Sequence, residues 1–272
     1  MELMKNKVGL VMGIANKNSI ATHIAKFLEE QGAEIAVSYQ PMGGDEDKYL
    51  ARIKKGSGLS PEASFYPCNV ANDEDIEALF EKLKSQYGKI DFIVHSIAYA
   101  DTQELASGVS NMSRKGFAEM MDISVYSLLK VANQAKDILG GGSLITLSHF
   151  GAQRAMAGFN GMGIAKAALE GSVRYLAQDI GAHNIRVNAV SAGPLRTLSS
   201  FGIGNFATMK DAYSNRCPLN NEINQIDVAK SVAYLASDLS LCTTGEIIHV
   251  DNGYHSVGLE QVAPDAQEES AA

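Results

Sequence analysis

Short apolar runs alternate along the chain with longer segments whose apolar residues recur every three to four positions. Runs this short, bounded by glycine, proline or small polar residues, are typical of buried strands. The expected strands are 7–12, 34–39, 64–70, 90–95, 143–147, 185–190 and 246–250. The longer segments have the period of amphipathic helices. The expected helices are 20–31, 45–55, 73–87, 114–139, 161–181 and 225–235.

The alternation of strands and helices predicts the fold class. Right-handed crossovers between successive strands give an α/β chain, a single Rossmann-type doubly wound domain. We expect a seven-stranded parallel sheet with helices on both faces. Asn18 or Ser19 is the expected N-cap of the first helix, which Gly32 ends. No change in composition marks a second domain, and the acidic, small-residue-rich stretch 261–272 is expected to be a disordered tail.

The carboxyl ends of parallel strands form one rim, where ligands bind in such sheets. The expected rim residues are Gly13, Gln40, Asn69, Ser96, Ser148 and Ser191. A strand that meets a helix through Gly13 makes an anion site suited to a pyrophosphate. Only one glycine of the G-x-G-x-x-G fingerprint is present, so a plain turn is the alternative. Gln40 stands where an acidic residue would select NAD and an arginine NADP, and this favours NAD(H).

Lys166 is the first indication of chemistry. Phe159 and Met162 lie seven and four residues before it, so all three share one helix face if the helix begins near Phe159. Tyr99 and Leu105 are candidates for an apolar pocket, with a place in the core as the alternative. The glycine-punctuated stretch 198–206 indicates a mobile flap over an apolar substrate, or else a packed turn.

Composition and charge limit the classes of partner that the chain is expected to bind. The chain has 272 residues, 46% of them apolar, and a formal charge of −8, which argues against nucleic-acid and anionic-membrane partners. Its three cysteines lack metal-ligand spacing, so no metal is expected. No signal peptide or membrane-length apolar run is visible, so we expect a cytoplasmic protein.

Several motifs together resemble one family. They are Gly13–Ala21, Tyr39-Gln40, His95–Ile97, Asp122–Ser124, Lys166–Glu170, Arg186–Thr197 and Gly245–Asp251. The chain resembles, to about residue 258, the NADH-dependent enoyl-[acyl-carrier-protein] reductases, a divergent branch of the short-chain dehydrogenase/reductase superfamily. The resemblance implies a homotetramer that transfers hydride from NADH to the β-carbon of trans-2-enoyl thioesters in fatty-acid biosynthesis. The acyl group would be carried on acyl carrier protein or coenzyme A. The resemblance also implies an NAD-binding, enoyl-reductase-like domain over 1–260, with a substrate flap near 195–212.

The resemblance assigns site residues position by position. The pyrophosphate would be held by Gly13, Ile14, Ser19, Ile20 and Thr197, and the adenosine by Gln40, Asn69 and Val70. The ribose would be contacted by Ser96, Ile97, Ala98 and Lys166, and the carboxamide by Leu195. Tyr99, Leu105, Met162, Ile203 and Phe206 would contact the substrate. The family usually has aspartate at the position of Asn69.

The catalytic stretch departs from the family pattern. The family has Tyr-x6-Lys, in which the phenol polarises the thioester carbonyl, but here that position is Phe159. His149 stands where the family often has a second tyrosine. The catalytic candidates are therefore His149, Phe159 and Lys166. Three interpretations stay open: His149 replaces the missing donor, the chain binds cofactor without turnover, or it reduces another substrate such as a ketone or imine. A merely structural role for His149 is a further alternative.

Overall fold

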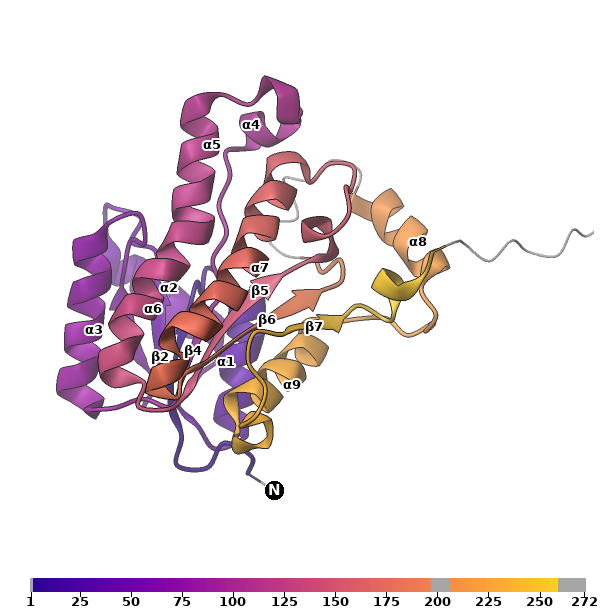
Figure 1. The fold of residues 1–272 in the computed structure, drawn as a ribbon. Coiled ribbons are helices and arrows are strands. Elements are labelled where there is room, and N and C mark those ends of the chain that lie inside the picture. Colours follow the sequence, from indigo (N-terminus) through magenta and orange to yellow (C-terminus); the bar gives the residue numbers. More distant parts are fainter. Residues whose placement is uncertain (1, 197–205, 259–272) are drawn as a thin grey trace, which may run out of the picture.

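All seven expected strands pair side by side in one parallel sheet. The computed structural model describes residues 2–196 and 206–258, and only the backbone of 206–209. The strands are β1 (Val8–Met12), β2 (Glu34–Tyr39), β3 (Ser64–Pro67), β4 (Phe92–His95), β5 (Ser143–Ser148), β6 (Arg186–Ala192) and β7 (Ile247–Val250). Their order is β3-β2-β1-β4-β5-β6-β7. The predicted doubly wound fold is confirmed (Figure 1).

Helices cover both faces of this sheet. The longer ones are α1 (Ile20–Glu30), α2 (Glu46–Ser57), α3 (Asp73–Tyr87), α5 (Arg114–Met121), α6 (Ser127–Ile138), α7 (Asn160–Ile180) and α9 (Gln225–Ala236). On one face α1 and α9 pack against each other and the sheet, and on the other face α3, α6 and α7 lie in a row (Figure 1). Each layer encloses its own apolar core. Strands covered on both faces read as continuous apolar runs, which is why the sequence located them.

The structure differs from the expected elements in four places. The helix expected over 114–139 contains a π-helical turn, Asp122–Tyr126, between α5 and α6. A short helix α4 (Thr102–Ala106), capped by Asp101, follows β4. A further helix, α8 (Phe206–Arg216), occupies the second half of the stretch expected to be a flap. β3 is also shorter than expected, because the chain turns after Pro67 toward α3.

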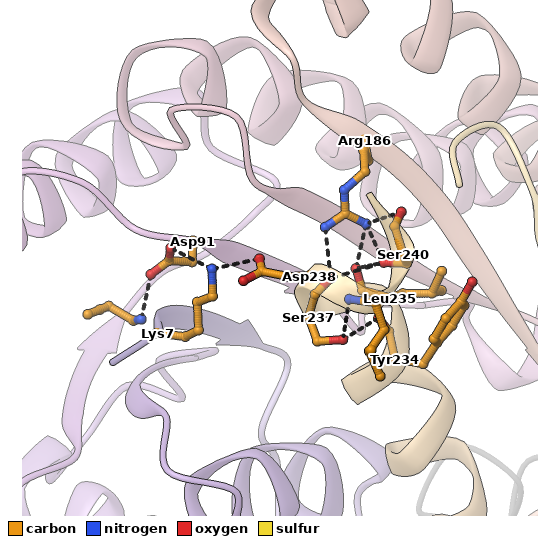
Figure 2. Close-up of polar contacts among 10 residues, drawn as sticks. Lys7, Asp91, Arg186, Tyr234, Leu235, Ser237, Asp238 and Ser240 are labelled. Carbon is orange, nitrogen blue, oxygen red and sulfur yellow. Dashed lines mark hydrogen bonds and ion pairs between the residues drawn. The ribbon is translucent and has the colours of Figure 1, made fainter. Parts of the chain in front are cut away.

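At the amino end of the sheet, Arg186 ties β6 to the end of α9 (Figure 2). Its Nη1 donates to the Leu235 carbonyl at 2.7 Å and to the Ser240 Oγ at 2.6 Å, and Nη2 donates to the Ser237 carbonyl at 3.5 Å. Burial lowers the pKa of the guanidinium. A cation at a helix carboxyl terminus meets the negative end of the helix dipole, which stabilises this buried charge.

A second polar link lies beside the first. Lys7 Nζ is 2.9 Å from Asp238 Oδ1 and 3.6 Å from Asp91 Oδ1 (Figure 2). Asp91 Oδ2 accepts from the Val8 amide at 2.8 Å. These contacts join the starts of β1 and β4 to the loop after α9. The amino ends of the strands are therefore held by charge-assisted contacts, away from the rim where ligands bind.

Candidate active site

The register of the strands brings the expected rim residues level with one another. Met12 pairs with both Ser38 and His95, so Gly13 and Ser96 follow neighbouring strand ends. On the other side of the sheet, Ser148 at the end of β5 pairs with Ser191 of β6. The rim therefore runs from the first β–α turn to the segment that contains His149.

Lys166 lies at this rim with its ammonium buried. The side chain comes from the second turn of α7 and is 6% exposed. Its Nζ donates to the carbonyl of Leu147, near the end of β5, at 2.8 Å. The pKa of Lys166 is lowered to about 8, because the effect of burial outweighs that of the Glu170 carboxylate, which acts to raise the pKa. A buried amine that has no carboxylate within salt-bridge distance in the described part of the chain marks a candidate site.

His149 and Phe159 lie together beside Lys166. Their ring centroids are 4.1 Å apart, with an interplanar angle of 55°. The Nδ1 of His149 accepts from the Gly151 amide at 2.8 Å. Its Nε2 is buried and has no hydrogen-bond partner among the described residues. Burial, and then the charge of Lys166, lower the pKa of His149 to about 3, so the imidazole is neutral near pH 7.

The helix α7 places Phe159 and Met162 as the sequence predicted. Phe159 is the residue just before α7 and has helical backbone angles, so the face it shares with Lys166 begins there. Met162 is half-buried and packs against the small cluster of Met120, Val125 and Ala165. The three side chains therefore line one side of the rim, with Met162 partly in the core.

The first β–α turn has the shape of a phosphate cradle. Gly13 has a φ of +90°, and a Cβ built there would lie 2.1 Å from the carbonyl oxygen of Ser96. Only glycine fits so close to the β4 exit loop. Ser19 is the N-cap residue of α1, as one of the two expected residues, but its side chain does not cap the helix. Its Oγ instead accepts from the amides of Ala15 and Asn16 at 3.3 and 3.1 Å and holds the loop. Ile20 begins α1, whose first amides point toward the turn.

The remaining nucleotide-side residues lie along the same rim in different environments. Ile14 is buried in the core, so only its backbone faces the rim. Gln40 is exposed at the end of β2, and Val70 is buried. Asn69 is half-buried, and its Oδ1 accepts from the Ala71 amide at 3.2 Å, which leaves its NH₂ group as the donor.

The β4 exit loop is fixed from behind by Ser124, which the sequence analysis quoted in a motif without a role. The buried Ser124 Oγ accepts from the Tyr99 amide and donates to the Tyr99 carbonyl, both at 3.0 Å. Ser96 and Ile97 are half-buried and Ala98 is exposed. The π turn that contains Ser124 thereby holds the strip of backbone expected to pass under the ribose.

The substrate side is only partly described. Tyr99 is exposed, and Leu105 lies in α4, where its carbonyl accepts from Asn160 Nδ2 at 2.6 Å. This bond joins α4 to the start of α7, next to Phe159. Leu195 is buried in the core. Thr197, Ile203 and the side chain of Phe206 lie outside the described residues, so the flap expected near 195–212 stays a prediction, as does the tail.

A buried carboxylate, quoted from the sequence in the motif Lys166–Glu170 but given no role, stands one turn after Lys166. Glu170 Oε1 accepts from Ser148 Oγ at 2.7 Å, and Oε2 accepts from Gln153 Nε2 at 3.3 Å. The spacing of four residues from Lys166 was the available signal, because such pairs share a helix face. The carboxylate therefore connects the end of β5 with α7 and with the charge of Lys166.

The series of hydrogen bonds that joins Ser148, Glu170 and Gln153 continues to β7. The Gln153 amide donates to Nε2 of His249 at 3.1 Å, and His249 stacks on His255 at 3.9 Å between centroids. Burial, and then the neighbouring His255, lower the pKa of His249. His255 Nδ1 lies 2.9 Å from Oδ1 of the buried Asp251. These residues support the site from the far end of the sheet.

Comparison with known proteins identifies the family. A family model described as enoyl-(acyl carrier protein) reductase matches residues 13–255. The chain belongs to this family. The enoyl-[acyl-carrier-protein] reductase [NADH] 1 of Rhizobium meliloti is 47% identical over 97% of this chain and 96% of its own.

Two solved members of the enoyl-(acyl carrier protein) reductase family are similar to the chain throughout. The Bacillus cereus enoyl-acyl carrier protein reductase with NADP+ and indole naphthyridinone is 41% identical, with a TM-score of 0.89 over 95% of this chain and 100% of that one. The reductase of Anaplasma phagocytophilum in complex with NAD is 40% identical, with a TM-score of 0.88 over 96% and 98%. The resemblance found in the sequence is therefore confirmed over nearly the whole length.

Two kinds of feature are absent from residues 2–196 and 206–258. No helix there combines the length and apolar character needed to cross a membrane. In the same ranges, no group of three or more histidine, cysteine, aspartate or glutamate side chains is arranged to hold a metal ion.

Proposed function

We propose that this chain is an NADH-dependent reductase of trans-2-enoyl thioesters that acts in fatty-acid biosynthesis. The buried Lys166 carries the proposal, because its ammonium stands at the rim of a family fold whose first turn is a phosphate cradle. The reaction consumes one enoyl thioester, one NADH and one proton, and yields the saturated thioester and NAD+. When bound, NADH supplies the hydride for this reduction.

The residues at the rim fit such a cofactor. The close approach of Gly13 to Ser96 leaves no room for a Cβ, and the amides of this turn and of the start of α1 would face a pyrophosphate. The Lys166 ammonium would donate to ribose hydroxyls, either in place of its hydrogen bond to the Leu147 carbonyl or in addition to it. The NH₂ group of Asn69 would meet the adenine edge. These side chains would orient the cofactor, with Ser96, Ile97 and Ala98 providing the backbone beneath it.

Gln40 supports NADH rather than NADPH. Its exposed amide follows β2, where it would bond a ribose hydroxyl but would not neutralise a phosphate. Titration of the purified protein with each nucleotide tests this, and tighter binding of NADPH than NADH would contradict it. Q40R is expected to shift the preference toward NADPH.

Acyl carrier protein is the carrier we propose, with coenzyme A as the alternative. Lys210 and Arg216, which lie in or just after the expected flap, are cations that an acidic carrier would contact, and both have partners within the chain. Lys210 Nζ is 2.6 Å from Glu222 Oε1, and Arg216 donates to the Val257 carbonyl. Comparing the same acyl group on the two carriers decides between them, since a docking contribution appears only as a lower KM for the protein carrier.

We also propose that the chain forms a homotetramer. Large apolar side chains are exposed on neighbouring helices, and they suit contacts between copies. They include Phe117 of α5, Leu129 of α6, and Ile164 and Tyr175 of α7. Sedimentation of the full chain tests this, with a mass four times that of one chain as the expected result.

A cofactor-binding chain without turnover is the second candidate. The observation that favours it is the phenyl ring of Phe159, which cannot donate a hydrogen bond where the family pattern has a phenol. The decisive assay follows NADH oxidation with crotonyl and dodecenoyl thioesters beside an NADH titration. Turnover supports the reductase, whereas NADH binding without turnover on any enoyl thioester supports the second candidate.

A further inference from the structure

The hydrogen bonding of His149 fixes where its proton lies. The backbone amide of Gly151 can only donate, so Nδ1, which is 2.8 Å away, is the acceptor. A neutral imidazole has one N–H group, and it must then be on Nε2. His149 therefore has the Nε2–H tautomer and offers a donor at that atom.

That donor is buried and unpaired within the described residues. An unsatisfied buried N–H is destabilising, so such a group calls for an explanation. The neighbouring ring of Phe159 has no acceptor and packs against the imidazole, with the ring centroids 4.1 Å apart. The packing thus keeps the N–H in place without using it.

The donor also stands close to the other groups of the site. His149 follows β5 directly, and Lys166 binds the carbonyl of Leu147 two residues earlier in the chain. Burial, and then the charge of Lys166, keep the pKa of His149 at about 3. The imidazole is therefore a hydrogen-bond donor near pH 7 and not a source of protons.

We propose that the Nε2–H of His149 donates a hydrogen bond to the thioester carbonyl oxygen of the substrate and takes the place of the phenol that Phe159 lacks. This rests on the proposed function. Negative charge develops on that oxygen as the β-carbon is reduced, and a positioned donor stabilises it. His149 keeps its proton throughout, and the α-carbon takes its proton from solvent.

The test uses three variants of the full chain and separates binding from turnover. H149F keeps an aromatic ring against Phe159 but removes the donor, and is expected to lower kcat by ~10²–10³-fold with NADH affinity unchanged. H149Q keeps an N–H donor near the position of Nε2 and should recover most of that loss. H149F combined with F159Y should also recover activity, because the new phenol supplies a donor.

Nuclear magnetic resonance of the ¹⁵N-labelled imidazole gives a readout independent of turnover. We expect the Nε2–H tautomer of His149 and no titration between about pH 5 and pH 9, since its pKa is about 3. A protonated ring or the Nδ1–H tautomer at neutral pH would overturn the proposal.

The outcomes distinguish this proposal from the function on which it rests. A wild-type protein that binds NADH but turns over no enoyl thioester overturns both. An active wild type with H149F equally active overturns the role of His149 and leaves the reductase in place. If H149Q and the double variant bind NADH normally and are as inactive as H149F, the role of His149 as donor is likewise wrong.

Discussion

The ammonium of Lys166 donates to the carbonyl of Leu147 at 2.8 Å inside the protein. This one contact brings α7 to the end of β5 and holds a cation where water is excluded. Because burial disfavours the charged form, the same contact couples the protonation of Lys166 to the stability of the fold.

The stability of the chain should depend on pH through Lys166. Its pKa is about 8 when folded, against the usual 10.5, so between these values the unfolded chain binds more protons. The free energy of unfolding therefore rises with pH across this window. Relative to K166M, which cannot titrate, the wild type should gain on the order of 3 kcal/mol from below pH 8 to above pH 10.5. Urea denaturation at several pH values measures this.

The control for this pH series is K26M, which removes an exposed lysine of α1. Between about pH 8 and pH 10.5, K166M should lose more of the wild type's pH dependence than K26M does. A difference between wild type and K166M that does not change with pH would contradict the lowered pKa.

Removing the charge of Glu170 should move the titration of Lys166 to lower pH. The carboxylate raises the pKa of Lys166, while E170Q retains an acceptor for Ser148. If the ammonium binds the cofactor, NADH affinity of the wild type should fall as pH rises through about 8. In E170Q the fall should begin at lower pH. Identical midpoints in the two proteins would show that Glu170 does not act on Lys166.

Gly13 should tolerate no side chain. In G13A the Cβ would lie 2.1 Å from the Ser96 carbonyl oxygen, with φ at +90°, so both the turn and the β4 exit loop must shift. We expect a loss of about 1–3 kcal/mol in stability from strain, together with weaker NADH binding. G43A is the matched control, since Gly43 has φ +73° but nothing within 4 Å of a Cβ. Equal NADH affinity in G13A and G43A would contradict the cradle.

Replacing Arg186 should affect stability and spare the site. A lysine at this position would present a single ammonium to acceptors that the guanidinium reaches with two nitrogens (Figure 2). We expect R186K to lose ~3 kcal/mol of unfolding free energy, as when a buried charged network loses a partner. NADH affinity at low temperature should be unchanged. R174K, at an exposed position of α7, should be within about 0.5 kcal/mol of wild type.

The sheet was predictable because helices cover both of its faces, so its strands stay apolar along their length. Helix α4 was missed because five residues are too few to show a helical period. The π turn at Asp122–Tyr126 was missed because its apolar residues fit the surrounding helix, and the bonds that Ser124 makes to Tyr99 exist only in the fold.

Site residues were predictable where a single segment of the sequence contains the pattern that indicates them. Lys166 was evident as a charge on an apolar helix face, and Gly13 as a glycine between a strand and a helix. The route from Glu170 through Gln153 to His249 was not, because its members come from separate segments that meet only in the fold. The unpaired Nε2 of His149 depends on a backbone amide and on burial, neither of which a residue pattern records.

The position of the Arg186 and Lys7 contacts also bears on how this sequence can diverge. They fasten the amino ends of the strands, whereas His149, Phe159 and Lys166 occupy the opposite rim. Substitutions at the rim therefore leave these contacts intact, so the side chains at the rim can change during evolution while the fold is kept. Phe159, where the resemblance places a tyrosine, is the kind of change that such a division permits.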